Sequence, residues 1–143
     1  MLIFSRVSRA DAEAIYTIVQ NVSGGAVSSG VPAVWDTGSP DGVRVTTPAA
    51  ATLSALAGIT GEAIASSGYG QLQVYGYNTQ AYLTNTTNTA VAAGDILKPV
   101  ASVTYLTRAG ASDGTTGFIT AMEAFATATT PAAVQKKVFV RCL

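Results

Sequence analysis

Residues 70–77 have the sequence Gly-Gln-Leu-Gln-Val-Tyr-Gly-Tyr, and this stretch decides the fold class. Apolar and polar side chains alternate along it, so that Leu72 and Val74 point to one side and the glutamines to the other. This pattern is typical of a β-strand with one buried face. Gly76 interrupts the alternation, which indicates a β-bulge or a close approach of another backbone segment. A strand is therefore predicted here, and residues 80–83 continue it.

Short β-branched and aromatic runs recur on both sides of this stretch, separated by clusters of Gly, Pro, Asn, Asp and Ser. Sustained helical periodicity is missing, and no fixed-period repeat or domain boundary stands out. The chain is therefore predicted to be all-β: a compact single-domain β-barrel or β-sandwich, with a β-tulip-like arrangement as one form, and with little helix. Further strands are predicted at residues 15–21, 31–36, 43–46, 96–100, 103–106 and 138–143.

Two segments leave room for a little helix. Residues 49–67 are rich in Ala, Gly and Ser, and they allow a helix that Gly58 and Gly61 would keep short. A helical turn also fits residues 9–13. The chain is divided into an N-terminal segment, residues 1–14, which is a candidate contact arm, and a single β domain, residues 15–143.

Charged residues are scarce in this sequence. Hydrophobic residues make up 48% and charged residues 11%, and the formal net charge is zero; charged residues average about 25% in soluble domains. Such a surface suits a protein that spends its life packed against neighbours. The scattered basic residues argue against nucleic-acid binding, and the chain has no apolar run of about 20 residues to span a membrane and no signal peptide.

Most kinds of catalytic and metal site are excluded by residue type. Histidine is absent, which removes Ser-His-Asp and Cys-His catalysis and the commonest metal ligand. The single cysteine, Cys142, can form no intrachain disulfide and is expected to act as a small buried apolar residue. Phosphate-binding loops are also missing. We therefore expect no enzyme activity, no cofactor and no metal.

The triplet Asp36-Thr37-Gly38 is the one motif that resembles a catalytic signature. Aspartic proteases use two such triplets, so this chain would have to form a homodimer, as retroviral proteases do. Those proteases also carry a second signature, an apolar run before Gly-Arg-Asp or Gly-Arg-Asn, which is absent here. The alternative interpretation is an Asx-type turn in which Asp36 accepts backbone N–H groups and Gly38 has a positive φ.

Four tyrosines gather around the strand at residues 70–77. They could form a stacking platform for sugars, which makes a carbohydrate-binding β module a second alternative. Because few charges lie near them in the sequence, a protein interface is the preferred interpretation. The four are Tyr69, Tyr75, Tyr77 and Tyr82.

The order of four segments resembles that of small virion proteins of tailed phages, the capsid cement or head decoration proteins. The segments are IVQNVSGGAVSSGVPAVWDTGSPDGVRVTTPA, LAGITGEAIASSGYGQLQVYGY, AAGDILKPV and KKVFVRCL. The resemblance covers roughly residues 15–143. It implies an all-β, non-enzymatic protein that binds the major capsid protein on the outside of the shell as a dimer or trimer, often at local two-fold or three-fold positions. It also implies synthesis in the bacterial host cytoplasm and a final location on the virion exterior.

Five residues are expected to contribute to such an interface: two arginines of the N-terminal segment and three aromatic residues. They are Arg6, Arg9, Trp35, Tyr75 and Tyr77.

Overall fold

A computed structural model describes residues 13–84, 90–110, 118–126 and 132–142. Within these residues the chain forms strands, one three-residue 3-10 turn (Leu53–Ala55) and no α-helix, which confirms the all-β prediction. The strands are β1 (Ala14–Asn21), β2 (Pro32–Trp35), β3 (Arg44–Thr46), β4 (Leu56–Thr60), β5 (Tyr69–Thr84), β6 (Ile96–Pro99), β7 (Leu106–Arg108), β8 (Ile119–Ala121) and β9 (Ala133–Arg141).

The first five strands close into a barrel, so the barrel form of the prediction is the one observed. Their order around the ring is β1-β3-β2-β4-β5, and β5 pairs back onto β1. The β1–β3 pair is parallel and the other four pairs are antiparallel. Closure removes most of the unpaired sheet edges that an open sheet would expose.

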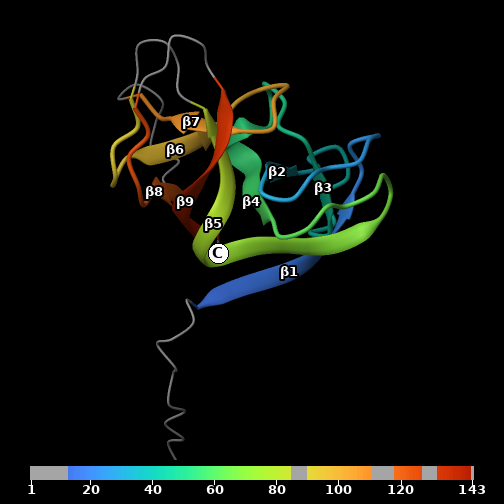
Figure 1. Ribbon diagram of the computed structural model, residues 1–143. Coiled ribbons are helices and arrows are strands. Elements are labelled where there is room, and N and C mark those ends of the chain that lie inside the picture. The colour runs from blue at the N-terminus through green and yellow to red at the C-terminus, as the bar shows by residue number, and fades with distance from the viewer. Residues whose placement is uncertain (1–12, 85–89, 111–117, 127–131, 143) are drawn as a thin grey trace, which may run out of the picture.

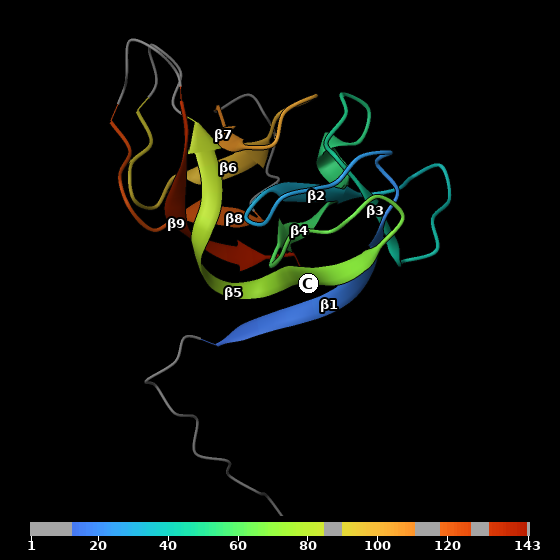
Figure 2. The ribbon, with the colours of Figure 1, turned by 45° about the vertical axis from the view of Figure 1, so that its right-hand side comes forward.

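Strand β5 continues beyond this barrel and joins a second ring. Its first half pairs with β1 and β4, while its second half pairs along its length with β9 and meets β7 at Leu83. The order β5-β7-β6-β8-β9 then returns to β5. Figures 1 and 2 show β5 running beside β1 and then bending to run beside β9. One sixteen-residue strand therefore belongs to both rings.

The second ring repeats the topology of the first. If β1–β5 are matched in order with β5–β9, every pairing and every strand direction agrees, including the single parallel pair in each ring (β1–β3 and β5–β7). An isolated bridge recurs at the matching place, Val27↔Ile64 in the first ring and Val91↔Phe125 in the second. The chain is thus built from two equivalent units.

Faint sequence likeness accompanies this repeat. The bridge residues lie in Ala26-Val27-x-x-Gly30 and Ala90-Val91-x-x-Gly94, and in Glu62-Ala-Ile-Ala65 and Glu123-Ala-Phe-Ala126. Val91 follows Val27 by 64 residues, whereas Phe125 follows Ile64 by only 61. Because the spacing changes along the chain, the repeat has no fixed period, and the search of the sequence for a fixed-period repeat did not find it.

Two hydrophobic cores fill the rings, and β4 is shared between them. Every residue of β4 is buried, with Ala57 in the first core and Leu56 and Ile59 in the second. The two rings therefore form one domain. The first core contains Val19, Ala33, Val45, Ala57, Ile64, Leu72 and Val74; the second contains Leu56, Ile59, Ala81, Leu83, Val91, Leu97, Leu106, Ile119, Ala121, Val138 and Val140.

Gly76 lies where β5 passes from β1 to β9, and the close approach of another backbone segment predicted for it is confirmed. The alternative, a β-bulge, lies two residues earlier: the register shifts between Ile15 and Tyr16 and leaves Val74 as the extra residue. Gly76 has a φ of 103°, and a side chain there would overlap the carbonyl oxygen of Glu13. Only glycine meets both requirements at low cost.

The helix allowed at residues 49–67 is not formed. Apart from the 3-10 turn, this segment supplies β4, because its apolar residues are needed in both cores. The strand predicted at residues 103–106 begins at Leu106 instead. The helical turn predicted at residues 9–13 lies outside the described residues except for Glu13, which is not helical.

Candidate interaction surface

The described residues hold no group of three or more potential metal ligands. They also include no helix that is long and apolar enough to cross a membrane. One shallow polar cleft of about 120 Å³ lies where Tyr16 and Gly61 meet the bend of β5, and ligand pockets for drug-sized molecules are larger, at about 300–1,000 Å³. This cleft is smaller than such a pocket, and the exposed faces of the described strands offer a candidate interaction surface instead.

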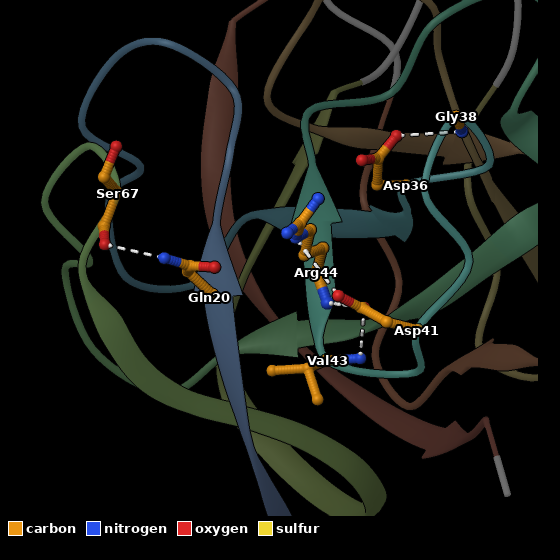
Figure 3. Close-up of polar contacts among 7 residues, drawn as sticks. All are labelled: Gln20, Asp36, Gly38, Asp41, Val43, Arg44 and Ser67. Carbon is orange, nitrogen blue, oxygen red and sulfur yellow. Dashed lines mark hydrogen bonds and ion pairs between the residues drawn. The ribbon is translucent and has the colours of Figure 1, made fainter.

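Asp36 lies at the end of β2 and forms an Asx turn. Its Oδ1 accepts the backbone N–H of Gly38 at 3.0 Å (Figure 3). This confirms the turn interpretation of the Asp36-Thr37-Gly38 triplet. The positive φ expected at Gly38 is wrong, since the glycine of this loop with a positive φ is Gly42 (73°).

A second Asx turn follows in the same loop. Oδ1 of Asp41 accepts the N–H groups of Val43 and Arg44, both at 2.9 Å, and Oδ2 lies 3.1 Å from Nε of Arg44 (Figure 3). These two backbone hydrogen bonds, aided by the Arg44 charge, lower the pKa of Asp41. The loop between β2 and β3 is thus ordered by local carboxylate contacts.

The aromatic residues expected at an interface are only partly open. Trp35 is half-buried and packs against the first core. The ring of Tyr75 meets Phe139 edge-on, with centroids 5.4 Å apart, and Tyr77 is half-buried beside the polar cleft. Neither ring lies open as a sugar platform would require, and Tyr82 is half-buried as well. Arg6 and Arg9 lie outside the described residues.

Three other side chains form the most open apolar feature, which we call the apolar strip: Tyr16, Ile18 and Tyr69. They are 47%, 58% and 67% exposed. Register places Ile18 opposite Gln71 and Gln20 opposite Tyr69, so all three project from the outer face of the β1–β5 ribbon. Gln20 donates from Nε2 to the Ser67 carbonyl at 3.2 Å (Figure 3).

The second ring carries polar residues where the two most exposed side chains of the strip lie. Asn21 pairs with β3 and Leu83 pairs with the matching strand β7, so these two residues are equivalent. Counting back three residues from each makes Ile18 equivalent to Gln80. Tyr69 likewise matches Gln135 through its cross-strand partner. Both glutamines are exposed. The same strand arrangement therefore forms with polar side chains at the two most exposed positions of the strip.

The strands that carry the strip contain no charged residue. None occurs among the eight residues of β1 or the sixteen of β5. On β9, by contrast, Lys136 lies 3.1 Å from Glu123, and this hydrogen-bonded pair lowers the pKa of Glu123. The residues of the β1–β5 ribbon are therefore uncharged and include exposed apolar side chains, as protein interfaces commonly do. One carboxylate lies beside the ribbon, that of Glu62, whose Oε1 accepts the N–H of Gln71 at 2.9 Å.

Cys142 packs against the second core and is half-buried. Burial raises the pKa of its thiol to about 12.

We expect iodoacetamide to alkylate Cys142 at pH 8 about a thousandfold more slowly than a thiol with the ordinary pKa, since only the thiolate reacts. The rate should climb with pH towards 12, while stability falls as the pH rises above about 9, where the unfolded thiol ionises. Mass spectrometry of timed samples, with urea-unfolded protein as the control, tests this; equal rates would contradict it.

The described residues form an all-β protein of two topologically equivalent rings, in which strands β1 and β5 carry no charged residue and expose apolar side chains. No family model matches its sequence, and no curated protein is significantly similar to it.

Proposed function

We propose that this protein is a structural component of a bacteriophage virion that binds the outside of the capsid and bridges neighbouring copies of the major capsid protein. The observation that carries the proposal is the apolar strip on strands without charged residues, at two positions where the second ring has exposed glutamines. The resemblance of the segment order to capsid cement proteins supports the same function.

The proposed mechanism is mechanical. Burial of one large apolar side chain contributes about 1.5–3 kcal/mol, so three of them form a useful centre for a contact. Because these side chains are already exposed to water in the free protein, they contribute little to its own stability and can contribute to binding instead. Because the protein would bind the assembled shell and not isolated subunits, it would stabilise the shell by mass action, and many copies would add their effects.

Capsids that lack the protein provide the direct test. Adding the purified protein should raise the temperature at which such capsids burst, measured by release of packaged DNA to a fluorescent dye. The double variant Ile18→Gln/Tyr69→Gln gives the strip the residues found at the equivalent positions of the second ring, so it should fold normally. It should bind capsids at least tenfold more weakly.

A matched variant on the second ring controls for general loss of apolar surface. Ile96→Gln/Met122→Gln changes two side chains that are 39% and 46% exposed but lie away from the strip. This variant should bind capsids as well as the unaltered protein does. No rise in burst temperature with the unaltered protein, or equal binding by both variants, would count against the proposal.

A further inference from the structure

Strand β1 has an open edge. On one side it pairs with β5 from Ala14 to Gln20, but on the other it pairs with β3 only at its last two residues. The N–H of Gln20 donates to the carbonyl of Val43, the residue before β3, so the backbone groups of Gln20 face the side of β1 on which β3 lies. Because backbone groups alternate along a strand, the N–H and C=O groups of Tyr16 and Ile18 face the same way. No strand in the described part of the chain pairs with them there.

This edge lacks the usual protection against pairing with another chain. Edge strands of monomeric proteins carry charges, prolines or bulges that block further strand addition. Between Tyr16 and Asn21 there is no charge, no proline and no register shift. The half-paired end of β9, in contrast, carries Lys136 and Lys137. The open edge of β1 is therefore suited to receive a strand.

We propose that the strand it receives is β1 of a second copy, paired antiparallel about a two-fold axis at Thr17. In this register Tyr16 lies opposite Ile18 of the other copy, and Ile18 lies opposite its Tyr16. Both residues present an outward N–H and C=O, so the two pairs exchange four backbone hydrogen bonds. Thr17, whose backbone groups face β5, lies at the axis opposite itself.

The side chains and the charge of the protein fit this pairing. An aromatic and a β-branched residue face one another twice, which is a favourable cross-strand combination. The formal net charge is zero, so two copies do not repel each other over distance. The β1–β5 ribbons then join into one sheet, and the two apolar strips meet on the same face. This inference deepens the proposed function by supplying a doubled strip suited to a two-fold position on the shell, but it can fail separately.

Charge substitutions test both the dimer and its register. In sedimentation equilibrium the unaltered full chain should have twice its 14.5 kDa mass. The variant Tyr16→Lys/Ile18→Lys sets lysine against lysine and should dimerise at least 100-fold more weakly. The variant Tyr16→Glu/Ile18→Lys sets glutamate against lysine twice, only in this register, and should recover dimerisation. A monomeric unaltered protein, or a second variant that stays monomeric, would overturn the proposal.

Crosslinking gives an independent measurement. In a non-hydrogen-bonded antiparallel pair the Cα atoms are about 4.5 Å apart, which lies within the range for a disulfide. Thr17→Cys should therefore form a covalent dimer under mild oxidation. Ile96→Cys, exposed on the second ring, and the native Cys142 alone should not. A Thr17→Cys protein that crosslinks no faster than Ile96→Cys would contradict the register.

The two proposals are separable by combining these results with capsid binding. A dimer that fails to bind capsids would leave the β1 pairing in place and remove the proposed function. A monomer that binds capsids would do the reverse.

Discussion

Gly76→Ala is expected to lower the free energy of unfolding by about 4 kcal/mol, a large share of the 5–15 kcal/mol typical of a domain. Two costs combine at this position. The φ of 103° is unfavourable for any residue with a Cβ, at about 1–3 kcal/mol. The new methyl group would also overlap the carbonyl of Glu13, and forced overpacking costs about 1–3 kcal/mol more. Urea denaturation followed by tryptophan fluorescence measures the sum.

Gly24→Ala separates the two costs. Gly24 has a similar φ of 82°, but a Cβ there would meet no atom within 4 Å. This variant should therefore lose only about 1 kcal/mol, the cost of the backbone conformation alone. If both variants lost the same free energy, the close approach of β1 to the bend of β5 would not be a determinant of stability.

Asn21→Leu is the second substitution with a large expected effect. Asn21 is 1% exposed, and its Nδ2 donates to the carbonyls of Gly25, Ile64 and Ala65 at 2.7–3.2 Å, while its Oδ1 accepts from the N–H and Oγ of Ser23. Leucine removes all of these bonds. The three carbonyls each keep another donor, namely the N–H of Val27, the N–H of Gly68 and the hydroxyl of Ser23. The cost is therefore that of the lost hydrogen bonds themselves, about 0.5–1.5 kcal/mol each, and we expect a total loss of about 3 kcal/mol.

The second ring supplies the reason to choose leucine. Leu83 occupies the equivalent position there and is fully buried, so the side chain itself suits the place in the strand. A large loss in Asn21→Leu would therefore report on the hydrogen bonds and not on shape. Ser23→Ala, which removes one hydroxyl and keeps the amide contacts, should cost less than 1 kcal/mol. Thermal unfolding of the two variants measures both effects. An Asn21→Leu variant as stable as the unaltered protein would contradict this account.

Much of the strand pattern could be predicted from alternation and turn residues. The stretch from Gly70 to Tyr77 and the short strand ending at Trp35 form where the pattern indicates, whereas the terminal strand predicted at residues 138–143 begins earlier, at Ala133, and ends at Arg141. Alternation fails at Gln73, which is buried at 1% because its amide donates to the carbonyls of Tyr75 and Tyr77 and accepts from Asn78. The bend of β5 brings the side chains of Gln73 and Asn78 together, and the local sequence pattern does not predict this contact.

The candidate surface was harder to predict than the fold. Tyr16 and Ile18 are typical strand residues, and the sequence does not say which face of a strand lies outside a closed ring. The large aromatic Trp35 attracts attention in a sequence, but it packs on the core. Comparison of the two rings finds the strip, because Ile18 and Tyr69 then stand against Gln80 and Gln135. That comparison needs hydrogen-bond registers, since the spacing between equivalent residues drifts.

The shared strand has one more consequence. A slip of β5 by a single residue would turn its inward side chains outward in both halves of the molecule at once, since alternate residues serve opposite faces. A register shift in β5 would therefore destabilise both rings, whereas a shift in a separate barrel would destabilise that barrel alone. The shared strand thus makes the register of each ring depend on that of the other.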